Sequence, residues 1–437
     1  MRPARQLLVA VWALGLFLAG SVGAAAGLRV SPVDGREYRI SGNGATAADT
    51  DAAVAWSQTD NTYLVVWQDG RSTGSRGLDI YGRLVGPDGV PVGPDFRISG
   101  PGAASDEETP AVSWDAAAEE YLVVWEDNRD FGLRGGDIYG RRVTAAGVPT
   151  GPDFRISGAG ATSDDEAPAL AWNQTAAEFL VVWQDDRNAG DSSWDVYGRR
   201  VDSGGVPTGE DFRISGAKAT GSEFDPAVAW NSAANQYLVV WNDYRSVAAG
   251  RGSDVYGRRL GGSGSPMGAD FRVCGGSATG WEYEAAVAWN DIAKQFLVVW
   301  NDYRNVGTGR GSDIYGKRVS AEGSPVGSDF RISGVNALAD DEDPAVDWNQ
   351  AGNLYQVVWA DKRNAASGRG SDIYGRRLEA DLTPVGGDFR ISGPNATSYE
   401  KSPTLAWNAD AGQHLVVWSD FRVPERGADI YGRKVNG

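Results

Sequence analysis

The chain has 437 residues, with 41 basic and 58 acidic side chains and a net charge of -17. This length exceeds what one hydrophobic core ordinarily supports, unless the chain is built from repeats. Because so negative a surface repels phosphate backbones, the composition argues against a nucleic-acid partner. Cys274 is the single cysteine of the sequence, which excludes an intrachain disulfide.

Residues 1–26 have the features of a secretory signal peptide. Arg2 and Arg5 give a basic start, Leu7–Leu18 is apolar, and Ala24–Ala26 are small residues of the kind found at cleavage sites. The apolar stretch is too short for a comfortable bilayer span. We therefore expect a secreted, periplasmic or cell-surface protein with no membrane span after cleavage, and a short lead-in over residues 27–36.

One sequence unit then recurs seven times, and its copies start near residues 37, 95, 153, 211, 270, 329 and 388. The second tryptophan of each copy recurs every 58 or 59 residues, at Trp67, Trp125, Trp183, Trp241, Trp300, Trp359 and Trp418. A fixed period of this size indicates one supersecondary unit that is stacked repeatedly. Residues 37–437 are therefore expected to form a single repeat domain.

Each copy contains four short strand-like runs separated by Gly, Pro, Asn and Asp. In the fourth copy these are Ala227–Trp230, Tyr237–Trp241, Val255–Leu260 and Phe271–Val273. The second run is apolar without alternation, as in a strand covered on both faces, whereas the last run type alternates apolar and polar residues, as in an outer strand. Radially stacked sheets satisfy both patterns, so the sequence predicts an all-β, seven-bladed β-propeller with four antiparallel strands per blade.

The two ends of the repeat region complement each other. The chain begins with a run of the outer-strand type, Tyr38–Ser41, and no such run follows Asp429–Val435 in the last copy. We expect the N-terminal strand to join the last blade and close the ring, which removes exposed sheet edges. An open array of repeats is the alternative, but neither end resembles the polar cap that an array would need.

Charged residues recur in every copy within the pattern W-x-D-x-R. Because residues i and i+2 of an extended segment share a face, this aspartate and arginine can pair with each other or with the next blade. We expect structural brackets between blades, since folding needs every blade whereas a site usually needs one. The brackets are Asp69, Arg71, Asp127, Arg129, Asp185, Arg187, Asp243, Arg245, Asp302, Arg304, Asp361, Arg363, Asp420 and Arg422. The aspartate that opens D-[IV]-Y-G also recurs, at Asp79, Asp137, Asp195, Asp254, Asp313, Asp372 and Asp429.

The succession of W-x-D-x-R and D-I-Y resembles the TolB-like β-propeller repeats of secreted bacterial and archaeal surface proteins. The resemblance covers Tyr38 to Val435 in all seven copies, with Gly-Arg or Gly-Lys after the tyrosine here. It implies the propeller fold and, because TolB-type proteins are periplasmic partners in protein complexes, a role in protein binding. It implies no particular activity, because propellers host many functions.

Residues that break the repeat are better candidates for a site than residues that keep it. The connections between blades, and those between second and third strands, should share one face of the propeller and carry most of the variation. In blades four and five they carry exposed rings, which could stack on sugar faces or seat an apolar residue of a partner. These candidate ligand-binding residues are Phe224, Tyr244, Trp281, Tyr283 and Tyr303. The alternative is that the rings only pack on each other.

Acidic runs precede three of the inner strands, at Asp106–Glu108, Asp164–Glu166 and Asp340–Asp343. Clustered carboxylates can hold Ca²⁺, although this spacing matches no calcium loop. Apart from Ca²⁺, the sequence predicts no metal and no cofactor.

The sequence contains no phosphate-binding glycine loop, zinc-ligand cluster or nucleophile elbow. Catalysis by carboxylates alone needs two acids in one pocket, and the repeats offer no way to choose a pair. We therefore expect no enzymatic activity, and favour a monomeric binding or scaffold propeller that recognises a protein or glycan through its long-loop face. A carboxylate-based glycan hydrolase and a purely structural surface-layer component are the alternatives.

Overall fold

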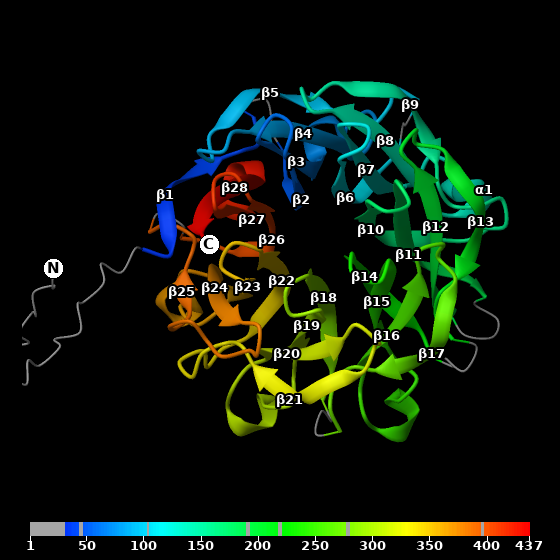
Figure 1. Cartoon of the computed structure of the whole chain (residues 1–437). Coiled ribbons are helices and arrows are strands. Elements are labelled where there is room, and N and C mark those ends of the chain that lie inside the picture. The colour runs from blue at the N-terminus through cyan, green and yellow to red at the C-terminus, as the bar shows by residue number, and fades with distance from the viewer. Residues whose placement is uncertain are drawn as a thin grey trace, which may run out of the picture. The chain divides into compact units, whose positions relative to one another are not determined.

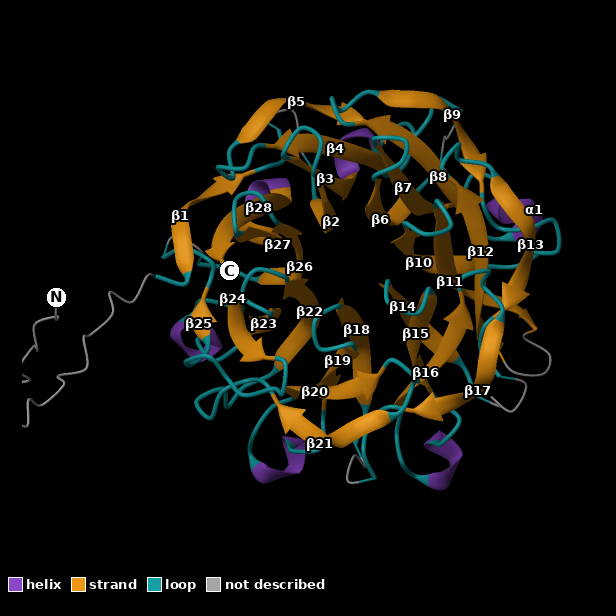
Figure 2. Ribbon diagram, viewed as in Figure 1, coloured by secondary structure: helices purple, strands orange, loops and turns teal. Residues whose placement is uncertain are grey.

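Within the part of the chain that the structure describes, the seven repeats fold into seven antiparallel four-stranded sheets around a central opening (Figure 1, Figure 2). This computed structural model describes residues 31–42, 47–102, 105–188, 193–216, 221–276, 280–394 and 397–437. The prediction of an all-β, seven-bladed propeller is confirmed. The expected signal peptide, residues 1–26, lies outside the described residues.

Each blade runs from an inner strand beside the opening to an outer strand at the rim (Figure 1). The inner strands are β2 (Asp49–Ser57), β6 (Glu107–Asp115), β10 (Asp165–Asn173), β14 (Glu223–Asn231), β18 (Glu282–Asn290), β22 (Asp341–Asn349) and β26 (Glu400–Asn408). The second strands are β3 (Thr62–Asp69), β7 (Glu120–Asp127), β11 (Glu178–Asn188), β15 (Gln236–Asp243), β19 (Gln295–Asp302), β23 (Leu354–Asp361) and β27 (Gln413–Val423). The third strands are β4 (Asp79–Val85), β8 (Asp137–Thr144), β12 (Ser193–Asp202), β16 (Asp254–Gly261), β20 (Asp313–Ser320), β24 (Asp372–Glu379) and β28 (Gly427–Asn436). The outer strands are β5 (Pro91–Arg97), β9 (Pro149–Arg155), β13 (Pro207–Arg213), β17 (Pro266–Arg272), β21 (Pro325–Arg331), β25 (Phe389–Arg390) and β1 (Val33–Arg39).

Over the ranges that the structure describes, the helices are single turns between second and third strands. They are α1 (Phe131–Arg134) and the 3₁₀ turns η1 (Gly70–Ser72), η2 (Val247–Ala249), η3 (Val306–Thr308), η4 (Ala365–Ser367) and η5 (Pro424–Arg426). Among the described residues, no helix has the length and apolar character needed to cross a membrane.

The seventh sheet contains both ends of the propeller. β1 pairs with β28, so that Val33 lies opposite Val435 and Tyr38 lies opposite Gly432. β1 begins at Val33 and therefore includes the last residues of the expected lead-in. Because β2 of the first blade lies against β26 of the last, the ring has no gap between these two blades (Figure 1).

The hydrophobic core lies between blades, which explains the unbroken apolar run of each second strand. In β3, Tyr63, Val65 and Trp67 pack toward the last blade. Leu64 and Val66, on the other face of the same strand, pack toward the second blade. A strand covered on both faces needs apolar residues at every position.

The second tryptophan of each copy is fully buried in all seven blades. Its indole N–H keeps a hydrogen bond, because Trp241 Nε1 donates to Asp243 Oδ2 at 3.1 Å and the equivalent bond recurs in each blade. A buried donor without an acceptor would cost about 1–3 kcal/mol. The aspartate of W-x-D is thus a partner of the core ring as well as of the arginine.

The repeated Asp–Arg pairs connect strands within one blade, which corrects the prediction that they bracket neighbouring blades. Arg245 pairs with Asp243 at the end of β15 and with Asp270 in β17, both at 2.5 Å, and its guanidinium lies 4.0 Å from the centre of the Tyr256 ring. The prediction assumed an extended segment. Instead, the Arg245 backbone N–H donates to Asp243 Oδ1 at 2.9 Å, and this turn folds the guanidinium back over its own blade. In the blade that contains both termini, Glu37 replaces the outer-strand aspartate.

The arginine after Tyr-Gly connects neighbouring blades. Arg83 Nη1 donates to the Ile40 carbonyl oxygen of the preceding blade at 2.9 Å, and the equivalent arginine does so at five further interfaces. In blade five Lys317 stands at this position and pairs with Asp329 at 3.1 Å. A link between blades therefore falls on the Gly-Arg that follows the tyrosine of D-[IV]-Y, whereas Lys317 pairs with an aspartate of its own blade.

Candidate functional site

A cavity of about 380 Å³ opens at the centre of the propeller, on the face where the inner strands begin. Each inner strand contributes its third and fourth residues to the wall. The loops between second and third strands start on the same face, because Asp243 at the end of β15 pairs with Asp254 at the start of β16. Ligand sites typically measure about 300–1,000 Å³, so the cavity is large enough for a small ligand or one unit of a longer chain.

A β-bulge in every inner strand places the third residue at this cavity. The register with the second strand shifts just after the second residue of each inner strand. The third residue is left-handed, with φ between 48° and 56°. Non-glycine residues rarely adopt this conformation, and bulges often re-aim a side chain beside an active site. The seven bulge residues are Asp51, Thr109, Ala167, Asp225, Glu284, Asp343 and Ser402.

Two of the four acidic bulge residues lie together. The Asp343 backbone N–H donates to Glu284 Oε2 at 2.7 Å, and Asn301 Nδ2 lies 3.5 Å from the same oxygen. Asp343 Oδ2 in turn accepts the Ser402 backbone N–H at 2.9 Å. Burial, followed by the negative charge of Asp343, raises the pKa of Glu284 to about 7. The cavity therefore holds a carboxyl group that keeps its proton close to neutral pH, next to a second carboxyl group.

The other two acidic bulge residues, Asp51 and Asp225, also line the cavity. Asp225 accepts a hydrogen bond from Asn242 Nδ2 at 2.9 Å. Burial raises the pKa of Asp51, and the charge of Asp343 acts in the same direction. The bulge residues of the remaining blades are Thr109, Ala167 and Ser402, so the acids are not distributed evenly around the opening.

More carboxyl groups lie beside the cavity on blades two and three. Glu108 and Glu126 stand directly opposite each other in β6 and β7. Burial raises the pKa of Glu126 to about 8, and the charges of Glu166 and Glu108 add to this effect. The raised pKa of Glu126 thus lessens the repulsion that two ionised carboxylates at opposite positions of a sheet would exert.

The five rings predicted to bind a ligand form one continuous cluster, here called the aromatic arc: Phe224, Tyr244, Trp281, Tyr283 and Tyr303. The centres of neighbouring rings are 5.3 to 6.5 Å apart, and the Trp281 and Tyr283 rings lie within 4° of parallel. Trp281 remains 38% exposed, and the other four are half-buried. The rings thus pack on each other, as the alternative interpretation held, and still present an apolar surface.

The aromatic arc borders the central cavity. Phe224 and Tyr283 directly precede the cavity residues Asp225 and Glu284 in the chain. Trp194 continues the cluster into blade three, with its ring centre 6.0 Å from that of Phe224. The sequence analysis missed Trp194, although it breaks the repeat at a position where the other copies have Leu, Gly, Ser or Ala.

The sequence analysis also missed a buried carboxyl group at the first position of every inner strand. All seven are fully buried at the interface with the preceding blade. They are Asp49, Glu107, Asp165, Glu223, Glu282, Asp341 and Glu400. The invariance of an acid at this position was a visible signal, but it stood among solvated-looking acidic connectors.

Within the acidic runs considered for Ca²⁺, neighbouring residues lie in different environments, because one of them is buried between blades. Glu107 lies in the blade interface, whereas its neighbour Glu108 faces Glu126. In the described part of the chain, none of the three runs brings three ligand atoms within 4.8 Å of one another. The runs therefore do not form the compact oxygen cage that Ca²⁺ requires.

One described group does meet this distance, namely Asp254, Cys274 and Glu282. Arg272 already pairs with Asp254 at 2.5 Å, and its Nε lies 3.2 Å from Cys274 Sγ. The other interfaces have the same arginine and aspartate, an aspartate or glutamate at the position of Glu282, and serine in place of Cys274. The group is therefore the ordinary interface network of this fold rather than a separate metal site.

No protein-family model matches the chain, and a search of curated proteins finds no relative. The TolB-like character of the repeats therefore stays a prediction. Among solved structures, a protein of unknown function from Dyadobacter fermentans DSM 18053 is similar with a TM-score of 0.56 and 10% identity, over 93% of this chain and 100% of that chain. An α-L-arabinanase from Penicillium chrysogenum, complexed with arabinobiose, gives a TM-score of 0.52 and 12% identity, over 75% of this chain and 92% of that chain. An α-L-arabinofuranosidase from Fusarium graminearum, in complex with an iminosugar inhibitor, gives a TM-score of 0.50 and 12% identity, over 93% of this chain and 98% of that chain.

These similarities correct the expectation that the protein is not an enzyme. That expectation relied on the absence of a recognisable catalytic motif, yet an arabinanase and an arabinofuranosidase share this architecture at 12% identity. At such identity the likeness establishes the fold alone. Catalysis by two carboxyl groups leaves no compact sequence motif, because the two acids need to be close in space and not in the sequence.

Proposed function

We propose that the protein is a glycan hydrolase and that its reaction takes place in the central cavity. The observation that carries the proposal is the contact between Glu284 and Asp343. Glycosidic bonds are ordinarily cleaved by two carboxyl groups in one pocket, one protonated and one ionised. Glu284, with a pKa of about 7 beside the charge of Asp343, supplies such a pair.

The hydrogen bonds support a different role for each member of the pair. Glu284 Oε2 accepts the Asp343 backbone N–H, so Oε1 is the oxygen that is left to carry the proton into the cavity. In this role Glu284 protonates the oxygen of the leaving sugar. Asp343, oriented by the Ser402 N–H, serves either as the nucleophile or as the base that takes a proton from the attacking water.

The aromatic arc is the proposed platform for the sugar chain. Aromatic rings present flat apolar faces with polar edges, which suits the faces of sugar rings. The arc borders the cavity on blades four and five, while the carboxyl groups Glu108, Glu126 and Glu166 lie on blades two and three. Because so acidic a mouth repels anions, we expect an uncharged glycan.

Replacement of Glu284 by glutamine tests the catalytic role. Glu284→Gln keeps the shape of the side chain but cannot donate the proton, so reducing-sugar release should fall by about 10²- to 10⁴-fold. Affinity for the same polysaccharide, measured by calorimetry, should change little. Glu425→Gln, at an exposed carboxyl group in η5, is the control and should retain full activity.

Two results would overturn the assignment. If wild-type protein releases no sugar from a panel of neutral polysaccharides, hydrolysis is wrong. If Glu284→Gln is as active as wild type, the reaction uses other carboxyl groups.

The double variant Trp281→Ala/Tyr283→Ala tests the aromatic arc. Loss of two stacked rings should weaken glycan binding by about 10- to 100-fold, since each ring contact contributes on the order of 1 kcal/mol. Ile292→Ala, which removes an exposed apolar side chain from the turn between β18 and β19, is the matched control. Unchanged affinity in the double variant would remove the arc from the site without affecting the role of Glu284.

A further inference from the structure

We propose that the seven buried carboxyl groups at the interfaces between blades are protonated in the folded ring, so that the link between neighbouring blades weakens as the pH rises. This inference concerns the closure of the propeller. It does not depend on the proposed hydrolysis.

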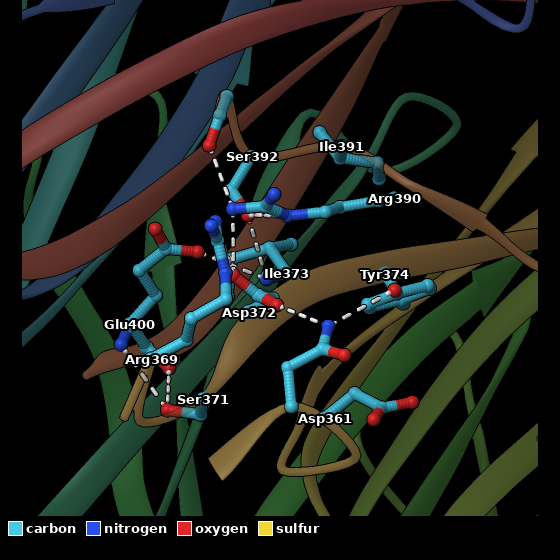
Figure 3. A network of polar contacts seen from close by, with 12 residues as sticks. Asp361, Arg369, Ser371, Asp372, Ile373, Tyr374, Arg390, Ile391, Ser392 and Glu400 are labelled. Atoms are coloured by element: carbon cyan, nitrogen blue, oxygen red, sulfur yellow. Dashed lines mark hydrogen bonds and ion pairs between the residues drawn. The ribbon is translucent and has the colours of Figure 1, made fainter. Parts of the chain in front are cut away.

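The interface between blades six and seven shows the link most clearly (Figure 3). Glu400 opens β26 of blade seven and reaches the start of β24 in blade six, where the Ile373 backbone N–H donates to Glu400 Oε2 at 3.0 Å. Ser371 of blade six donates its hydroxyl to the Glu400 carbonyl oxygen at 2.7 Å and accepts the Glu400 N–H at 3.1 Å. Glu400 is therefore anchored to the neighbouring blade by both its backbone and its side chain.

The charged groups around Glu400 pair with one another, so that Glu400 is the acid left without a cation. Asp420, from β27 of its own blade, pairs with Arg422. Asp372, from β24 of blade six, pairs with Arg390 of β25 at 2.6 Å. Each of these carboxylates therefore has its own guanidinium.

Two further cations lie near this interface without serving Glu400. Arg369, on the loop before β24, lies 3.4 Å from Asp372, and Lys401, the next residue of β26, is exposed. In the described structure no lysine or arginine nitrogen approaches the Glu400 carboxyl group within 4.0 Å. A buried acid without a cation is stable only in its neutral form.

A similar arrangement recurs around the ring in two variants. At Glu107 an arginine comes nearer than at Glu400: Arg97 Nη2 lies 3.8 Å from Glu107 Oε2, although it pairs more closely with Asp79, at 2.5 Å. Where the residue is glutamate, the longer side chain reaches the preceding blade: Val196 N–H lies 3.4 Å from Glu223 Oε2, and Cys274 Sγ lies 3.4 Å from Glu282 Oε2. Where the residue is aspartate, the shorter side chain lies against the W-x-D aspartate of its own blade. Asp49 lies opposite Asp69 in this way, and the charge of Asp69 adds to burial in raising the pKa of Asp49.

Burial raises the pKa of every member of the set. The value is about 8 for Asp49, Glu107, Glu223, Glu282 and Glu400. For Asp165 and Asp341 it lies well above the ordinary range, and the nearby W-x-D aspartate adds to the effect of burial.

The sign of the pH dependence follows from linkage. A carboxyl group whose pKa is raised by folding binds more protons in the folded state than in the unfolded state. Its stabilising contribution is complete below the unfolded pKa of about 4.3 and is lost as the pH rises through the folded value of about 8. In that window each group should shift the unfolding equilibrium constant by about tenfold per pH unit.

The test is equilibrium unfolding of the full chain by urea at a series of pH values from 5 to 9. Wild-type protein should lose stability steadily as the pH rises. A second protein has glutamine at Glu107, Glu223, Glu282 and Glu400, which keeps the shape of these side chains but removes their ionisation. In this fourfold variant the number of protons released on unfolding should fall by about four. Asp410→Asn, at an exposed position, is the control and should leave the dependence unchanged.

Infrared spectroscopy of wild-type protein gives a second measurement that requires no variant to fold. Protonated carboxyl groups should be visible at pH 7 and should disappear as the pH passes about 8. If the fourfold variant does not fold, Glu400→Gln alone should lower the dependence by about one proton. The proposal is overturned if no protonated carboxyl signal exists at pH 6.5, or if the glutamine variants keep the full pH dependence of wild type.

Discussion

The aspartate of each W-x-D segment serves several partners at once. Asp243 accepts the Trp241 indole N–H, the Arg245 backbone N–H and the Arg245 guanidinium. One short side chain thus satisfies a buried ring, fixes a turn and holds the cation that joins two strands. The importance of such a residue follows from the number of groups that would lose a partner without it.

We predict that Asp243→Ala destabilises the protein by about 3–5 kcal/mol, because it leaves a partly buried guanidinium and a buried indole N–H without their acceptor. Urea unfolding measures the change. Lys294→Ala, which removes the exposed pair with Asp291, is the control and should cost about 0–1 kcal/mol. If Asp243→Ala instead abolishes glycan binding and leaves the free energy of unfolding unchanged, Asp243 belongs to the binding site.

At the level of strands, the pattern of each repeat was sufficient to predict the architecture. The continuous apolar run of β15 and the alternating run of the outer strands are direct consequences of how many faces each strand buries. The Asp–Arg brackets were misplaced because the prediction treated Trp241–Arg245 as extended, whereas an Asp243 side chain that accepts the Arg245 N–H bends the chain there.

The candidate site was predictable only in part. The aromatic arc was found because its rings interrupt the repeat, and the same signal at Trp194 was overlooked. The pair of Glu284 and Asp343 could not be found, because acidic residues occur at or near this position in most copies. Which of several adjacent acids faces the opening depends on the bulge at the third residue, and a bulge leaves no mark in the hydrophobic pattern.

The strand β1 gives a prediction at the same scale. A variant that starts at Gly42 lacks β1 and leaves the edge of β28 unpaired, together with Arg433, which otherwise donates to the Gly35 carbonyl oxygen at 3.1 Å. Exposed strand edges promote association, so we expect a lower melting temperature and oligomers in light scattering. A variant that starts at Pro32 keeps β1 and is the control. A stable monomer without β1 would show that this strand is dispensable for the ring.

For the molecule as a whole, the face with the central cavity is divided into sectors of different chemistry. The carboxyl groups Glu108, Glu126 and Glu166 lie on blades two and three, the aromatic arc lies on blades four and five, and the Glu284–Asp343 contact connects blades five and six. The seven blades have similar folds, but these differences define one direction across the face with the cavity, along which an extended ligand can bind.

The proposed acid role of Glu284 predicts the pH dependence of hydrolysis. A general acid acts only while protonated, so the rate should be highest below its pKa and fall as the pH rises through about 7. Initial rates between pH 5 and 9 measure this limb. Circular dichroism at each pH shows whether the fold is intact. It therefore separates deprotonation of Glu284 from loosening of the contacts between blades, and the loosening is expected closer to pH 8. A rate that increases through pH 7 would contradict the assignment.

The left-handed bulge residues have a consequence for how such a molecule can change. Their side chains lie at the wall of the central cavity, and the seven positions already tolerate Asp, Glu, Thr, Ser and Ala on nearly the same backbone. New chemical groups can therefore be introduced at the central cavity in one blade at a time, while the rest of the fold is unchanged.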